Sequence, residues 1–253
     1  MATGHTLNLY GGSVNGSVYG GHSASGATTG NTVNLGNGTT NDVTTVTGTI
    51  YGGSGTDTTD NVLNVNTNAT VGNIANFGMV NFNYKATTTN DANPMLTISG
   101  GATTFDWGKF TYKGAMPTSG KLTLMKNTAN INLGTTYRGA KELPGSDTTE
   151  AFIDTNTSAA TATEILIKGY TFKGNALTPT TGSATEDVWA GRSVIGNTTT
   201  GNTLTVNGTT HRDAYGGWTA GTGTSKAAKK DSTGNTVNLM SGTVRNIYGG
   251  FTS

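Results

Sequence analysis

The sequence predicts an all-β fold, a parallel β-helix in which short strands stack in successive coils. One phrase, an aromatic–Gly–Gly step followed by Gly–Asn–Thr, returns along the chain, and repetition every few tens of residues is typical of a solenoid. The apolar residues are mostly Val, Ile, Leu and aromatics that alternate with polar residues, which is the period of a strand. Thr, Asn and Gly dominate the rest, and all three are poor helix formers.

The repeated phrase identifies the unit of the stack. Its copies lie at Tyr19-Gly20-Gly21 with Gly30-Asn31-Thr32, at Trp189-Ala190-Gly191 with Gly201-Asn202-Thr203, and at Tyr215-Gly216-Gly217 with Gly234-Asn235-Thr236. The chain opens on the second half of a copy and closes on a new first half, Tyr248-Gly249-Gly250. We therefore expect a segment of a longer repeat array.

The strand after each Gly–Asn–Thr step has one apolar face. In residues 32–35, Val33 and Leu35 point to one side, while Thr32 and Asn34 point to the other. Stacking such strands builds a continuous core, with Val33 and Val237 inside. The glycine pairs are expected in turns with positive φ. The repeated asparagines suit either a turn or a buried ladder of amides between coils.

We interpret residues 1–253 as a single β-solenoid segment with three zones. Runs such as 164–167 have strand composition and are expected to add rungs to the same stack. Segments 138–150 and 174–187 contain Pro, Gly and acidic residues and are the expected loops. The zones are regular repeats in 4–84, less regular rungs with longer loops in 85–187, and regular repeats in 188–253.

Charge and composition argue against several classes of function. The net charge is +1, and only 11% of the residues are charged. Nucleic-acid binding needs a strong positive field, so we expect no nucleic-acid partner. No apolar run is long enough to span a membrane, and we expect no membrane contact by this segment. The chain has no cysteine, which agrees with export and with a stack that needs no disulfides.

Residues that carry chemistry are few, and we expect no catalytic site, no metal and no cofactor. The three histidines, His5, His22 and His211, show no metal-ligand spacing. The run His211-Arg212-Asp213 favours a solvated turn over a catalytic cluster.

Two carboxylate pairs come nearest to the sets that glycan-cleaving β-helix enzymes use. They are Asp57 with Asp60 and Glu186 with Asp187, and isolated loop charges are the favoured interpretation. The run Gly52-Gly53-Ser54-Gly55-Thr56-Asp57 matches the start of a calcium nonapeptide, but no neighbouring copy completes such a site.

Aromatic residues are the best candidates for binding. Rings at equivalent repeat positions either form an outward ladder for sugar rings or close the end of the core, and we favour the second. Trp107 and Trp218 break the repeat, so together with Tyr215 they are the candidate ligand-binding residues. The equivalent positions are Tyr19, Tyr51, Trp189, Tyr215 and Tyr248.

The repeat resembles that of a known family. Gly-Asn-Thr-Val-Asn-Leu followed by Gly-Thr-Val and Ile-Tyr-Gly-Gly, carried by residues 31–53, 202–217 and 235–250, looks like the passenger repeat of Gram-negative type V autotransporters of the haemagglutinin or adhesin kind. This resemblance implies a right-handed parallel β-helix, displayed outside the cell on a parent anchored in the outer membrane and used for attachment.

We therefore expect an extracellular, non-catalytic adhesin segment that attaches to glycans or proteins on host or bacterial surfaces. The alternatives are a structural stalk and a β-helix enzyme that cleaves glycans. An ice-binding solenoid is a fourth, but the unequal unit lengths argue against its uniform flat Thr face. Exposed terminal rungs are open β-edges, so end-to-end self-association is also expected.

Overall fold

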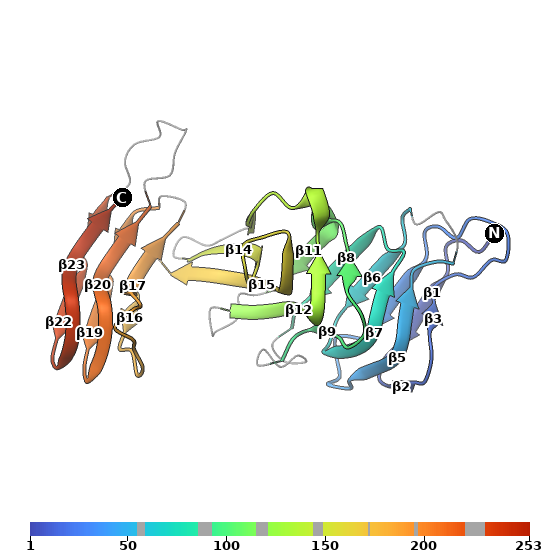
Figure 1. The fold of residues 1–253 in the computed structure, drawn as a ribbon, viewed down its shortest axis with the longest axis horizontal. Helices are drawn as coiled ribbons and strands as arrows, with labels where there is room; N and C mark the ends of the chain where they lie inside the picture. Colours follow the sequence, from blue (N-terminus) through green and yellow to red (C-terminus); the bar gives the residue numbers. More distant parts are fainter. Residues whose placement is uncertain are drawn as a thin grey trace. The chain divides into compact units, whose positions relative to one another are not determined.

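The computed structural model describes residues 1–54, 59–85, 93–114, 121–143, 149–171, 173–194, 197–220 and 231–253. Strands dominate these residues, and most neighbouring strands run parallel in register, so the predicted all-β parallel solenoid is confirmed (Figure 1). Contacts divide the chain into two compact units, Met1–Lys141 with Phe152–Lys168, and Glu142–Ala151 with Gly169–Ser253.

In the first unit, each coil contributes a strand to each of two parallel sheets. One sheet consists of β1 (Thr6–Leu9), β4 (Thr32–Leu35), β6 (Val62–Val65), β8 (Met79–Asn83) and β11 (Phe110–Lys113). The other contains β2 (Gly12–Val14), β3 (Val18–Tyr19), β5 (Thr44–Tyr51), β7 (Ala69–Ala75), β9 (Leu96–Ile98), β10 (Thr103–Thr104) and β12 (Lys121–Asn132). Two short 3-10 helices, η1 (Trp107–Lys109) and η2 (Gly134–Thr136), interrupt the strands of the described residues.

The register places like side chains above one another, as the alternation predicts. Val33 pairs with Leu63, which pairs with Val80, and all three are fully buried. On the opposite face, the Asn64 amide donates to Asn34 Oδ1 at 2.7 Å, and Asn34 donates to Asn8 in the same way. Each of the strands β4, β6 and β8 thus adds two apolar residues to the core and one amide to an outer ladder.

The middle of the chain departs from the expected stack. The run 164–167 lies in β15 (Thr161–Thr171), which pairs antiparallel with β12, so the expectation that it adds a parallel rung is wrong. On its other side β15 neighbours β14 (Thr149–Thr155), and only residues 156–160 separate the two strands, too few for the crossover of about a dozen residues that parallel pairing with β14 would need. The short β13 (Lys141–Leu143) lies within the expected loop 138–150.

A buried carboxylate holds the antiparallel strands together. Asp154 accepts hydrogen bonds from Tyr137 Oη (2.7 Å), Lys168 Nζ (3.0 Å), Ser158 Oγ (2.9 Å) and the Thr155 amide (2.8 Å). Burial raises the pKa of Asp154, but these hydrogen bonds outweigh burial and hold the pKa below its ordinary value. The carboxylate therefore stays ionised and satisfied at neutral pH.

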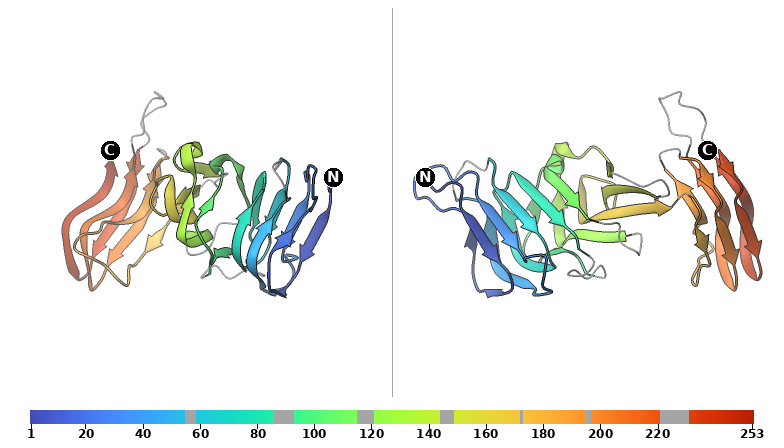
Figure 2. Two further views of the ribbon diagram at one scale, coloured as in Figure 1. Left: turned by 45° about the vertical axis from the view of Figure 1, so that its right-hand side comes forward. Right: turned by 180° about the vertical axis from the view of Figure 1, so that it is seen from behind.

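The second unit also consists of coils of parallel strands, which here form three sheets (Figure 2). Its strands are β16 (Ala176–Leu177), β19 (Thr203–Val206) and β22 (Thr236–Leu239) in one sheet, β17 (Val188–Ser193), β20 (Thr209–Thr219) and β23 (Gly242–Thr252) in the second, and β18 (Thr199–Thr200) with β21 (Ser232–Thr233) in a third. All of these pairings are parallel. The expected loop 174–187 contains β16.

The asparagines of the repeat form buried ladders between coils. Asn202 Nδ2 donates to Asn235 Oδ1 at 2.8 Å, and Asn31 Nδ2 donates to Asn61 Oδ1 at 3.1 Å. Asn31, Asn61 and Asn202 are fully buried. Of the two roles that the sequence left open, the structure therefore shows the amide ladder.

Close packing on these amides, rather than positive φ, explains the glycines of the aromatic–Gly–Gly step. A Cβ on Gly191 would collide with the Asn202 amide, and one on Gly217 would collide with Asn235. Neither glycine has positive φ, so the expected turn role of the glycine pairs is wrong. Positive φ occurs instead at the glycine before the asparagine, for example at Gly201 (65°). The two halves of the repeat therefore recur together because they pack against each other.

Candidate functional site

The second unit carries two columns of aligned side chains on the sheet β17-β20-β23. In the first column, Trp189 pairs with Tyr215, which pairs with Tyr248. The Tyr215 and Tyr248 rings stack at 4.9 Å and 10°, and the Trp189 and Tyr215 rings stack at 6.2 Å and 15°. Three coils therefore present one continuous stack of rings.

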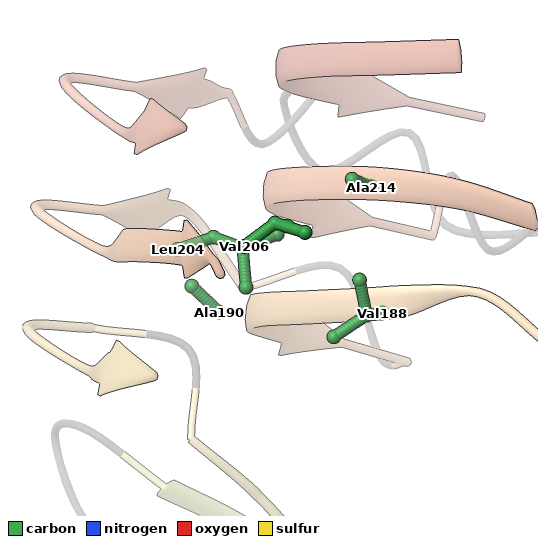
Figure 3. Packing of buried hydrophobic residues seen from close by; sticks show 5 residues of the cluster. All are labelled: Val188, Ala190, Leu204, Val206 and Ala214. Atoms are coloured by element: carbon green, nitrogen blue, oxygen red, sulfur yellow. The ribbon is translucent and has the colours of Figure 1, made fainter. Parts of the chain in front are cut away.

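The first column lies on the face of its sheet opposite the core cluster, although Tyr215 at its centre is only 8% exposed. Val188 and Ala190 flank Trp189 in β17 and pack with Leu204 and Val206 of the facing sheet, as Figure 3 shows. Because successive residues of a strand point to opposite faces, Trp189 points away from this core. The favoured expectation that these rings close the core agrees with the burial of Tyr215, which is 8% exposed, but not with Tyr19 of the first unit, which is 44% exposed.

The second column lies beside the first. Arg192 pairs with Trp218, which pairs with Phe251, each three residues after a ring of the first column. Phe251 meets Tyr248 edge-on at 5.4 Å and 67°. We call these two columns together the aromatic surface; its members are Trp189, Tyr215, Tyr248, Arg192, Trp218 and Phe251.

Rings enclose the guanidinium of Arg192. Its Cζ lies 4.4 Å from the centroid of the Trp189 ring, 4.9 Å from that of Tyr170 and 5.3 Å from that of Trp218. Such contacts attract a cation to the negative faces of the rings. Two buried N–H donors here, Arg192 Nε and Trp189 Nε1, have no hydrogen-bond acceptor among the described residues.

Two ion pairs on the same sheet contrast with Arg192. Arg212 binds Asp187 through two hydrogen bonds of 2.7 and 2.6 Å, and Arg245 binds Asp213 through two of 3.0 and 2.7 Å. The hydrogen bond from Arg245 is the main reason that the pKa of Asp213 lies below its ordinary value. Burial, followed by the nearby carboxylates, raises the pKa of Tyr215. Tyr215 is therefore a neutral hydroxyl at physiological pH.

The first unit contains a shorter version of this arrangement. Tyr19 stacks on Tyr51 at 4.9 Å and 7°, and Tyr19 is 44% exposed. His22 meets Tyr19 edge-on at 5.5 Å, in the place that Phe251 takes beside Tyr248. The same motif therefore produces an outward pair of rings in both units.

Of the three candidate ligand-binding residues, the structure brings two together. Trp218 is half-buried and Tyr215 is 8% exposed, and both belong to the aromatic surface. Trp107 lies in the first unit, is 5% exposed and packs on Phe110 and Tyr137. Trp107 therefore belongs to a different unit from Tyr215 and Trp218 and is not part of the aromatic surface.

Sequence reasoning did not single out Arg192 or Phe251. A signal was present, because His22, Arg192, Trp218 and Phe251 stand three residues after the aromatic residue in four of the five steps. Ser54 takes this place after Tyr51. The recurrence of a ring or a guanidinium at this position in the other four steps indicates a shared surface.

The run His211-Arg212-Asp213 is not a solvated turn. It lies inside β20, and His211 is 5% exposed, with Nε2 3.0 Å from Thr209 Oγ1. His211 also lines a cavity of about 360 Å³ together with Glu186 and Asp187. The expectation of a turn fails because the strand extends through these residues and buries alternate side chains.

The remaining site expectations concern carboxylates, metals and membranes. Asp187 pairs with Arg212, whereas Asp57, with part of the calcium-like run, lies outside the described residues. Within the described ranges, no three His, Asp or Glu residues gather closely enough to hold a metal ion. In the same part of the chain, no helix has the length and apolar character needed to cross a membrane.

Comparison with known proteins gives no relative. No protein-family model, no curated protein and no solved structure matches this chain.

Proposed function

We propose that this chain is a non-catalytic, extracellular adhesin segment whose aromatic surface binds glycans on host or neighbouring cells. The observation that carries the proposal is the stack of Trp189, Tyr215 and Tyr248 on the face of the sheet opposite the core cluster, extended by the half-buried Trp218 and Phe251. A sugar ring has an apolar face that packs on an aromatic ring. Rings held at the spacing of the coils form a platform longer than a single sugar.

The rigidity of the platform supports a binding role. Each ring is fixed by its own coil, and each coil is locked to the next by a buried asparagine ladder. A binding surface that is already ordered loses little conformational freedom when a ligand arrives. The repeat that builds this platform is also the one that resembles autotransporter passengers, so we propose a parent protein anchored in the outer membrane.

A glycan array probed with the whole 253-residue chain tests the proposal. We expect binding to a subset of glycans, weakened about tenfold or more by Tyr248→Ala or Trp218→Ala, since an aromatic contact contributes roughly a factor of ten. Thr205→Ala is the matched control, because Thr205 is a half-buried position of β19 on the neighbouring sheet. Equal binding by all three variants would place the ligand elsewhere.

Two further outcomes separate the alternatives. No binding to any glycan or cell surface would favour the structural stalk, which the asparagine ladders also suit. Release of new reducing ends from a bound glycan would overturn the non-catalytic assignment. In that case the cavity beside His211, Glu186 and Asp187 is the first place to look for acid–base groups.

A further inference from the structure

Arg192 differs from the other two arginines of its sheet. Arg212 and Arg245 each bind a carboxylate of this chain through two hydrogen bonds. Within the described part of the chain, Arg192 has no carboxylate partner and contacts aromatic rings instead. The three rings compensate the charge of the guanidinium only in part, because a ring face carries no net charge.

Two donors at this place lack an acceptor among the residues that the structure describes. They are the buried Arg192 Nε and Trp189 Nε1, and the guanidinium carbon lies 4.4 Å from the centroid of the Trp189 ring. Native proteins rarely leave buried N–H groups unsatisfied, and each case calls for an explanation. The indole N–H of Trp189 and the Nε–H of the cationic Arg192 therefore suit a ligand that carries oxygen acceptors and a negative charge.

The neighbouring rings define the rest of the ligand. Trp218 and Phe251 continue the column above Arg192, and Tyr248 continues the column above Trp189. An anionic group at Arg192 therefore lies at the end of a platform that suits apolar sugar faces. A guanidinium recognises planar anions through two parallel hydrogen bonds, which an ammonium cannot reproduce.

We propose that the glycan bound by the aromatic surface is acidic, and that Arg192, with the indole N–H of Trp189, binds its carboxylate. This proposal rests on the proposed function and names the class of glycan. Binding requires a small rearrangement of side chains that exposes the two buried donors. A sulfate ester offers the same oxygen acceptors, and the experiment distinguishes it from a carboxylate.

The test compares glycans that differ only in charge. Calorimetric titration of the whole chain with tetragalacturonate, with neutral galactotetraose and with a sulfated galactan oligomer measures the three affinities. We expect tetragalacturonate to bind at least about tenfold more tightly than galactotetraose, since a charge-assisted hydrogen bond contributes that factor or more. Preference for the sulfated oligomer alone would support an anion site that takes sulfate.

Variants locate the effect. Arg192→Met is expected to remove the preference for the acidic glycan and retain binding of the neutral one, whereas Arg192→Lys restores only part of the preference. Arg245→Met is the matched control, because Arg245 lies on the same sheet but is bound to Asp213. Equal loss in Arg192→Met and Arg245→Met would overturn the proposal in favour of a general positive field.

A spectroscopic readout keeps the test valid if a variant fails to fold. The chain has three tryptophans, so its ¹⁵N–¹H spectrum contains three indole signals. Tetragalacturonate should shift the Trp189 indole signal of the unmodified chain, and a shift confined to Trp107 would overturn the proposal. Equal affinity for acidic and neutral glycans overturns only this inference, whereas no binding of any glycan overturns the proposed function as well.

Discussion

Replacement of Asn61 by alanine tests the asparagine ladder. Asn61 is fully buried and lies just before β6. Its amide donates to Thr28 O (2.9 Å) and Asn76 O (3.2 Å), while its Oδ1 accepts from the backbone N–H (2.9 Å) and the side chain (3.1 Å) of Asn31. One side chain thus satisfies groups from three other segments of the chain.

The expected loss follows from the groups left unpaired. Asn61→Ala leaves two carbonyls, on Thr28 and Asn76, and the Asn31 N–H without these partners. A buried polar group without a partner costs about 1–3 kcal/mol, and water entering the vacated space satisfies some of the three. We therefore expect a decrease of about 3–6 kcal/mol in the free energy of unfolding of this region.

A neighbour in the outer ladder provides the control. Asn64 also joins two coils, since it donates to Asn34 at 2.7 Å and accepts from Asn81 at 2.8 Å, but it is half-exposed. Water replaces these hydrogen bonds after Asn64→Ala, so a loss of about 1 kcal/mol or less is expected.

Urea unfolding followed by circular dichroism measures both variants. Hydrogen exchange of the Asn31 amide localises the effect, because the stability of a repeat protein is distributed among its coils. Equal losses in Asn61→Ala and Asn64→Ala, or a loss below about 1 kcal/mol in Asn61→Ala, would refute the reasoning that burial makes the inner ladder essential.

Three further predictions concern packing, pH and association. Gly191→Ala should lower the free energy of unfolding by about 1–3 kcal/mol, because its methyl group overlaps the buried amide of Asn202. Gly101→Ala, whose added methyl group meets no atom, should leave the free energy of unfolding unchanged, and the midpoints of urea unfolding compare the two variants. The depressed pKa of Asp154 contributes stability that is complete above its unfolded pKa of about 3.9 and is lost as pH falls through the lower folded value, so Asp154→Asn should flatten the acid limb of the stability profile. The coil of β22 and β23 exposes Leu239 (47%) and Met240 (71%), so this chain should associate end to end as its concentration rises. Sedimentation velocity measures the association, and a double variant Leu239→Lys with Met240→Lys that associates as strongly as the unmodified chain would contradict the prediction.

The sequence by itself predicted the all-β parallel stack and the faces of its strands. Val33 is fully buried, as alternation requires, because a strand of period two has only one apolar side here. For the repeated asparagines the sequence left a turn and an amide ladder open, and the structure shows the ladder. The stack and the strand faces depend on the local residue pattern and on its repetition, so they can be predicted from the amino-acid sequence.

Only the tertiary structure decided how the two halves of the repeat meet. The contact between Gly191 and Asn202 joins residues on different strands of one coil, and no local pattern distinguishes it from a turn glycine. The antiparallel pairing of β15 with β12 joins segments that are far apart in the sequence, and the composition of the run 164–167 does not specify the direction of its partner. Likewise, the aromatic surface exists because parallel register places Arg192, Trp218 and Phe251 in one column, and register between coils is a property of the folded stack.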